Sequence, residues 1–157
     1  DYASGNIESF KVNADAFMSL IGDMDRLLAT RDEFLLGNWL ESAKAMGDTP
    51  EESKLYEKNA RNLLGTWGNK DCKLFDYACK QWSGMMNGYY KQRWSLFFED
   101  VLANWGHYDQ KEFAEKCKDY EWDWISDTTC FPTETIGDEI EVVKSIWNKY
   151  SSDLLND

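Results

Sequence analysis

Two glycines and a set of aromatic and amide side chains near the middle of the sequence could form a shallow sugar-binding groove. Gly84 and Gly88 are four residues apart, so on a helix they share one face, where the missing side chains let another group come close. Aromatic rings stack on the apolar side of a pyranose, and amides and hydroxyls bond to its hydroxyl groups. Close packing of another helix against the glycines explains the same spacing and is the simpler interpretation. The walls of the groove would be Trp67, Tyr77, Gln81 and Tyr89.

Other side chains of this region are charged or lie at the end of a predicted helix. Asp76 and Lys80 have the i and i+4 spacing of a helical ion pair, which would be solvated and weakly stabilising. Arg93 follows Tyr89 by four residues and can stack on that ring or pair with a carboxylate of a partner surface. Trp67 is flanked by glycines at a predicted helix end, so its ring can project from the scaffold instead of filling the core.

The sequence contains no recognisable catalytic constellation of its own. The acids Glu51-Glu52 and Glu139/Glu141 could in principle act as a glycosidase pair, but both pairs fall in first turns of predicted helices, where acids favour the helix dipole. The single histidine, His107, has no nucleophile near it in the sequence. P-loop, dinucleotide-binding and HExxH motifs are absent. We therefore expect no catalytic residue and no cofactor in this chain.

The cysteines do not have the spacing of a metal site. Their positions are Cys72, Cys79, Cys117 and Cys130, without any C-x-x-C pair. If Cys72 and Cys79 shared one helix, their separation of ~10 Å would be beyond the reach of a disulfide. We expect free thiols and no metal site.

Composition favours one helical domain that does not bind nucleic acid. The 157 residues suit a single domain, and the high aromatic content of 15%, with only two prolines and ten glycines, favours helices over many short strands. The net charge of −12, from 29 acidic and 17 basic residues, repels phosphate backbones and anionic lipids. No apolar run approaches the ~18 to 20 residues that cross a bilayer. The first residues, DYASGN, do not resemble a secretory leader, so we expect a chain outside the membrane.

Apolar periodicity and capping signals predict the first three helices. One stripe extends from Phe10 to Leu28. Capping boxes at residues 30–33 and 49–52 would open a second and a third helix, the latter with Pro50 at its first position. The side chains expected to face inward on these two helices are Leu36, Trp39, Leu40, Ala43, Leu55, Tyr56, Leu63 and Trp67.

The longest predicted helix follows, from residue 75 to residue 105. It has no proline and an uncharged middle at residues 81–90, which indicates a central helix covered on most sides. Asp109 and Glu112 have the spacing of a cap for a fifth helix. A sixth would carry Ile136, Ile140, Val143, Trp147 and Tyr150. The predicted fold is all-α, a single bundle-like domain of about six helices with one long central helix.

A family resemblance lies in several short segments between residues 34 and 94. These segments are Phe34-Leu35-Leu36-Gly37, Trp39-Leu40, Tyr56-Glu57, Asn59-Ala60-Arg61, Trp67-Gly68, Asp76-Tyr77-Ala78, Lys80-Gln81, Gly84, Tyr89-Tyr90 and Arg93-Trp94. In their order and spacing, they resemble the C-terminal helical domain of alpha-N-acetylglucosaminidases, glycoside hydrolase family 89. The likeness extends at lower density over residues 10–102 and fades beyond Gly106.

The resemblance implies that residues 1–157 are the C-terminal all-helical domain of a larger multidomain glycosidase. Members of that family are retaining exo-glycosidases that remove terminal alpha-linked N-acetylglucosamine from glycans, heparan sulfate being the lysosomal substrate. Two glutamates of a (β/α)8 barrel act there as acid/base and nucleophile, and neither has a counterpart in this chain. The implied partners are that barrel, in the same parent chain, and a glycan with terminal N-acetylglucosamine. The implied location is extracytoplasmic, meaning periplasmic, secreted or lysosomal.

By the same resemblance, the helical domain would pack beside the barrel and close one wall of its cleft. The motif residues could face that cleft or mark only the interface with the barrel. A different class of function also fits, namely an independent helical module that binds a glycan or a protein. The residues predicted to bind substrate are Trp67, Asp76, Tyr77, Gln81, Tyr89 and Arg93.

Overall fold

The computed structural model describes residues 1–74 and 76–155, and within these ranges the chain forms six α-helices and no strand. The predicted all-α class and helix number are confirmed. A 3₁₀ turn, η1 (Asp32–Phe34), precedes α2, and a π-helical segment, η2 (Met86–Tyr90), leads directly into α4. The α-helices are α1 (Ile7–Leu28), α2 (Leu36–Lys44), α3 (Pro50–Leu64), α4 (Lys91–Ala103), α5 (Gln110–Ser126) and α6 (Glu139–Leu155).

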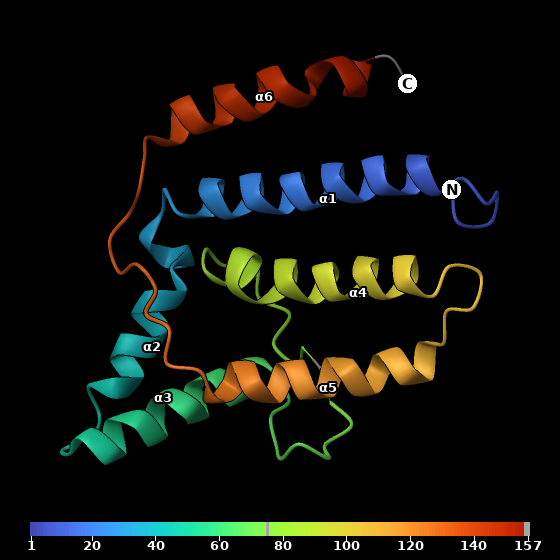
Figure 1. The fold of residues 1–157 in the computed structure, drawn as a ribbon. Helices are drawn as coiled ribbons and strands as arrows, with labels where there is room; N and C mark the ends of the chain where they lie inside the picture. The colour runs from blue at the N-terminus through green and yellow to red at the C-terminus, as the bar shows by residue number, and fades with distance from the viewer. Residues whose placement is uncertain (75, 156–157) are drawn as a thin grey trace.

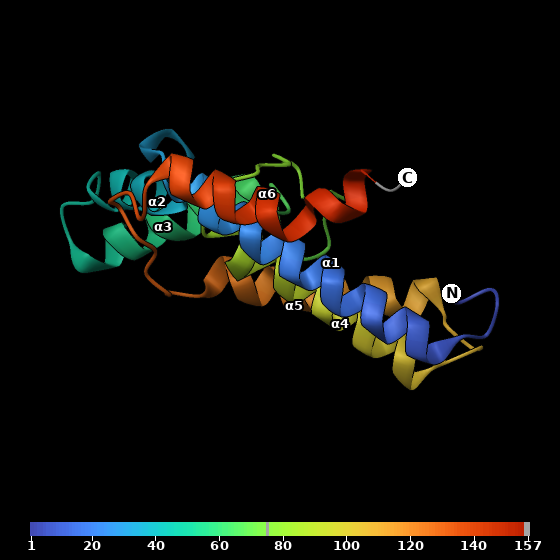
Figure 2. The same cartoon turned by 90° about the horizontal axis from the view of Figure 1, so that it is seen from above.

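Four of the helices lie side by side in one layer, in the order α6, α1, α4, α5, and the pair α2 and α3 lies across one end of it (Figure 1). Figure 2 shows this layer from its edge, with α6 nearest the viewer. The main helix contact of α6 is with α1.

The core lies where α2, α3, η2 and α5 meet. Its buried members are Leu36, Leu40, Ala60, Leu64, Met85, Tyr89, Trp124 and Ile125. The ring of Phe131 packs over Gly84 and Gly88, and a Cβ at either glycine would lie 2.8 Å from a ring carbon. Close packing therefore explains the two glycines, as the simpler interpretation held, although the packed group is a single ring and not another helix. Gly84 also has a φ of +90°, which places it before the helix, not within it.

Two of the three predicted caps are confirmed. The Thr49 hydroxyl accepts a hydrogen bond from the Glu52 amide, and the Glu52 carboxylate accepts one from the Thr49 amide. Asp109 caps α5 with its carboxylate, which accepts hydrogen bonds from the amides of Lys111 and Glu112, without a reciprocal bond from Glu112. The box predicted at Thr30 is wrong, since the Thr30 hydroxyl donates to the carbonyl of Leu27 at 2.8 Å. The backbone at residues 34–36 instead pairs with Ser83, which holds it extended and delays the start of α2.

The predicted inward face of α3 is also wrong. Leu55 and Leu63 are 54% and 42% exposed, whereas Arg61 is fully buried and pairs with Glu57 at 2.9 Å. Arg61 also donates to the carbonyl of Thr129 at 2.7 Å. Because α3 buries an ion pair, its apolar residues alone do not identify its inner side. Trp39 of α2, likewise expected inside, is 40% exposed.

The predicted central helix begins later than the pattern indicated. Residues 76–84 are irregular, helical geometry starts at Met85, and residue 75 lies outside the described ranges. Asp76 and Cys79 have φ values of +46°, which a helix does not allow. The amides of Tyr77 and Ala78 donate to carbonyls at the end of α3. The predicted Asp76–Lys80 helical pair is therefore wrong, and the longest helix is α1, with 22 residues.

Candidate functional site

A buried polar cluster where the 76–84 segment meets η2, α4 and α5 contains three of the predicted site residues. The Tyr90 hydroxyl donates a short hydrogen bond to the Asp76 carboxylate. Arg93 Nε lies 3.3 Å from Oε1 of Glu121, whose side chain is fully buried. The fully buried Tyr89 lies beside both charged groups and influences their titration. The 76–84 segment, α4 and α5 thus each contribute one charged side chain to this cluster: Asp76, Arg93 and Glu121.

Burial dominates the electrostatics of this cluster. It raises the pKa of Glu121 to about 6, although Arg93 acts in the opposite direction. It also raises the pKa of Asp76, against the opposing hydrogen bond from Tyr90. The Tyr90 phenol, buried beside the Asp76 carboxylate, has a raised pKa and stays protonated. Neither oxygen of Glu121 has a hydrogen bond of good geometry within the described part of the chain. The ionised form of Glu121 is therefore destabilised by burial, and protonation at mildly acidic pH removes this destabilisation.

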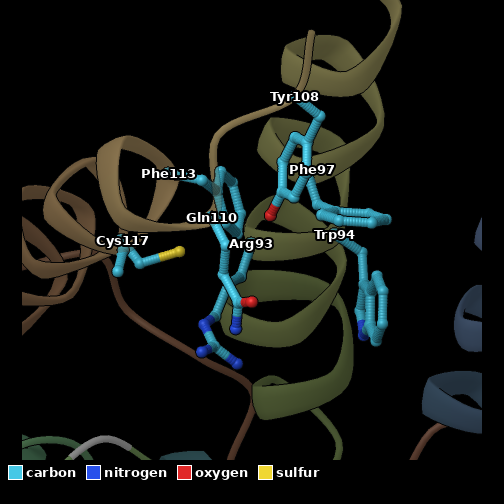
Figure 3. A pocket seen from close by; sticks show the side chains of 8 residues that line it. Arg93, Trp94, Phe97, Tyr108, Gln110, Phe113 and Cys117 are labelled. Atoms are coloured by element: carbon cyan, nitrogen blue, oxygen red, sulfur yellow. The ribbon is translucent and has the colours of Figure 1, made fainter. Parts of the chain in front are cut away.

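A cavity of about 290 Å³ lies between α4 and α5, next to this cluster (Figure 3). Arg93 supplies its charge, and Cys117, whose thiol has a pKa raised by burial, lines one wall. Figure 3 shows the Cys117 sulfur pointing into the space between the helices. The remaining lining residues are Trp94, Phe97, Tyr108, Gln110, Phe113 and Ala114. Such apolar walls with one cation and one amide suit binding, not acid-base chemistry.

Trp67 and Tyr77 form a stacked aromatic pair at the surface. Their ring centroids are 4.4 Å apart with an angle of 15°, and each side chain is half exposed. Trp67 has a φ of +50°, and Asn62 holds this turn by accepting hydrogen bonds from Thr66 and Gly68. Backbone bonds from residues 77–78 to the end of α3 fix the partner ring. The pair is a rigid platform of the kind that stacks on a sugar ring.

Gln81 lies apart from both groups. It is exposed, and its amide donates to the Cys79 sulfur at 3.6 Å. It also lines a groove between α1 and α4 that Tyr90 and Trp94 share. The predicted site residues therefore occupy three places: the buried cluster, the aromatic pair and this groove.

Sequence reasoning missed Tyr90 and Glu121. Glu121 follows Cys117 by four residues and precedes Trp124 by three, so it lies on the apolar stripe of the fifth helix. A carboxylate within an apolar stripe indicates a buried charge, so the sequence alone could have predicted that Glu121 is buried. The Asp76–Tyr90 bond had no such signal, because it depends on the irregular path of residues 76–84.

The described residues contain no group of three or more His, Cys, Asp or Glu side chains that could hold a metal ion. All four cysteines are free, with Cys79 and Cys130 exposed and Cys117 buried. Over the described ranges, no helix has the length and hydropathy needed to cross a membrane.

Comparison with known proteins identifies the family. The sequence profile described as Alpha-N-acetylglucosaminidase (NAGLU) C-terminal domain matches residues 1–149. Human Alpha-N-acetylglucosaminidase is 34% identical over 134 residues, which are 83% of this chain and 18% of the human protein. A family 89 glycoside hydrolase from Clostridium perfringens, in complex with PUGNAc, superposes with a TM-score of 0.84 at 32% identity, covering 99% of this chain and 19% of that one.

A second structure from Clostridium perfringens, in complex with its substrate GlcNAc-alpha-1,4-galactose, gives a TM-score of 0.79 at 32% identity over 94% of this chain and 18% of that one. The chain thus spans less than a fifth of the length of these relatives. Fold and sequence together define a helical domain of the kind that family 89 glycoside hydrolases contain. The chain belongs to the alpha-N-acetylglucosaminidase C-terminal domain family. The predicted resemblance is confirmed, and it continues past Gly106 into the last two helices.

Proposed function

We propose that this chain is the accessory helical domain of an alpha-N-acetylglucosaminidase, an enzyme that removes terminal alpha-linked N-acetylglucosamine from glycans. One observation carries the proposal: the family match covers nearly the whole chain but only 18% of a relative's length. The catalytic carboxylates would then belong to a (β/α)8 barrel in the rest of the parent chain. Here Asp76 and Glu121 are already engaged with Tyr90 and Arg93, which suits holding the fold, not attacking a glycosidic bond.

Within that enzyme, we assign the Trp67–Tyr77 pair to the wall of the substrate cleft. The two rings are half exposed and held by backbone bonds on both sides, so they can stack on a sugar without reorganising. Asp76 adjoins Tyr77 in the sequence, and its carboxylate can accept a hydrogen bond from a sugar hydroxyl. The exposed Gln81 lines the groove between α1 and α4 and is not part of this wall.

Tyr89 and Arg93 would support this wall from behind. Tyr89 is fully buried, and Arg93 is paired with Glu121, so both act through the position of η2 and α4. An extracytoplasmic location, in the periplasm, the medium or the lysosome, is part of the proposal and rests on the family resemblance.

The test compares this chain with its parent enzyme. The parent should hydrolyse an aryl alpha-N-acetylglucosaminide, while this chain alone, with its helix content verified by circular dichroism, should not. Replacing both rings of the pair by alanine in the parent should raise KM several-fold. Leu55→Ala, at an exposed position on α3, is the control and should leave KM unchanged. Turnover by this chain alone would overturn the accessory role.

The exposed aromatic pair also favours a second candidate, an independent glycan-binding module. In that case N-acetylglucosamine should change the tryptophan fluorescence of this chain without any partner, and Trp67→Phe should remove most of the change. A flat response to millimolar sugar would contradict this candidate.

A further inference from the structure

The cavity between α4 and α5 has the size and lining of a small-molecule site. Its volume of about 290 Å³ is close to the lower end of the ~300 to 1,000 Å³ that ligand sites in proteins enclose. The glycan contacts proposed above, from the Trp67–Tyr77 pair and Asp76, do not line it. A ligand for this cavity would therefore be small and would bind apart from the proposed sugar contacts.

Aromatic rings that contact one another form the apolar part of the cavity. The ring of Phe97, on α4, lies 5.5 Å from that of Phe113, on α5, and 5.7 Å from that of Tyr108, in the connecting loop. Trp94 packs against Phe97 at 5.5 Å. Because the rings hold one another in place, the apolar surface is preformed, and little side-chain ordering opposes the binding of an apolar group.

Arg93 brings a positive charge to the same cavity. Its guanidinium lies below the rings of Tyr108 and Phe113 in Figure 3. Within the described part of the chain, its Nε has no hydrogen bond of good geometry, and 34% of the side chain is exposed. A guanidinium has five N–H donors in a planar fork that matches a carboxylate. Donors of Arg93 are therefore available to a ligand that carries a carboxylate.

The acids around Arg93 determine how strongly it attracts an anion. Glu121 approaches its Nε at 3.3 Å, which is longer than the ~2.7 to 2.9 Å of a strong charge-assisted bond. Asp76 is engaged by a phenol hydroxyl, and Asp100, on α4, is paired with Lys116. Glu121 is thus the acid that competes most directly with a ligand for the guanidinium.

We propose that the cavity between α4 and α5 binds a small aromatic carboxylate, with its carboxylate on Arg93 and its apolar part among the rings of Trp94, Phe97 and Phe113. A cation would also find aromatic faces here, but the charge of Arg93 would repel it. The inference does not depend on the proposed glycosidase, because it needs only the contacts between α4 and α5.

The test compares three ligands of similar length: hydrocinnamate, its carboxamide and phenylpropylamine. Each is titrated into the full chain by ligand-observed NMR at about pH 7, where the carboxylate is ionised. Hydrocinnamate should bind with a Kd of about 1 mM or below. The carboxamide should bind at least about fivefold more weakly, because it loses the charge-assisted bonds to Arg93. Absent binding, equal affinities for carboxylate and carboxamide, or tighter binding of the amine would each overturn the proposal.

Variants locate the binding in the cavity, with the helix content of each verified by circular dichroism. Ala114→Trp fills the cavity and should abolish binding, whereas Ala103→Trp, exposed on α4 outside the cavity, should leave it unchanged. Glu121→Gln removes the competing carboxylate and should tighten hydrocinnamate binding by about threefold or more. Unchanged affinity in Ala114→Trp, or weaker binding in Glu121→Gln, would overturn the proposal.

The double variant Arg93→Gln/Glu121→Gln covers the case in which Ala114→Trp does not fold. It removes both charges together, so no buried carboxylate is left without a counter-charge. It should bind hydrocinnamate and its carboxamide equally, and a retained preference for the carboxylate would overturn the proposal.

The titration is then repeated in the parent enzyme, where loss of hydrocinnamate binding would also overturn the proposal. None of these measurements uses a sugar. Carboxylate binding in a parent without glycosidase activity would therefore refute the proposed function alone, and absent binding in an active parent would refute the carboxylate site alone.

Discussion

The buried carboxyl of Glu121 should make this domain more stable at mildly acidic pH than at neutral pH. Burial raises its pKa from 4.5 to about 6. A carboxyl whose pKa is higher in the folded state binds its proton more tightly there, so its stabilisation is fully present below the unfolded pKa. The stabilisation is lost as the pH rises through about 6. The difference between the two pKa values corresponds to about 2 kcal/mol of unfolding free energy.

The perturbation that tests this is Glu121→Gln, because glutamine has the shape of the protonated acid and cannot ionise. Urea unfolding of both proteins, followed by tryptophan fluorescence, gives their free energies at about pH 4 and about pH 7.5. The unfolding free energy of the variant minus that of the original protein should increase by about 2 kcal/mol from about pH 4 to about pH 7.5. Asp23 and Asp127, whose pKa values are lowered, act in the opposite direction but equally in both proteins.

The Glu121→Gln substitution does not leave Arg93 as an unpaired charge without access to water. Its side chain is 34% exposed, so water can solvate the guanidinium once its partner is neutral. Glu115→Gln, at an exposed position on the same helix, is the matched control and should follow the original protein at both pH values. A free-energy difference that is the same at both pH values for Glu121→Gln would refute the burial argument.

Three further variants test the packing, the capping and the polar cluster. Gly88→Ala should lower the unfolding free energy by about 1–3 kcal/mol, because the new Cβ would lie 2.8 Å from the Phe131 ring. Thr49→Ala should cost about 1 kcal/mol in thermal unfolding, since it removes the hydroxyl that caps α3. Tyr90→Phe should cost about 1–3 kcal/mol in urea unfolding, because it leaves the half-buried Asp76 carboxylate without its donor.

Controls within the chain separate these effects from general sensitivity. Gly22→Ala adds a Cβ in α1 whose nearest neighbour is the flexible end of Lys91, so it should be neutral or stabilising. Thr30→Ala removes a hydroxyl that opens no helix and donates only to the Leu27 carbonyl at the end of α1, which already accepts the Thr30 amide, so it should cost less than Thr49→Ala. Equal effects within either pair would contradict the structural reasons given above.

Local signals account for what was predicted correctly. The caps at Thr49 and Asp109 were found because each depends on hydrogen bonds between residues three or fewer positions apart. The helical class followed in the same way from apolar spacing and sparse prolines. The predicted helix was wrong over residues 76–84 because the amides of Tyr77 and Ala78 donate to carbonyls at the end of α3, a partner that apolar periodicity does not encode.

Buried charges account for much of the remainder. Apolar periodicity predicts which side of a helix faces the core, but α3 buries Glu57 with Arg61, and α5 buries Glu121 near Arg93. Each charge is tolerated only because a partner from the same or another element reaches it. Such pairs appear in the sequence only as polar residues on an apolar stripe.

The sequence by itself determined the helical class, the two local caps and the family. Only the tertiary structure decided the Asp76–Tyr90 contact, the Trp67–Tyr77 pair and the exposure of Trp147 on α6. The reason is the distance along the sequence between the interacting residues. A cap or an apolar stripe depends on residues within a few turns of one helix, whereas desolvation, ring stacking and exposure depend on distant segments that the fold brings together.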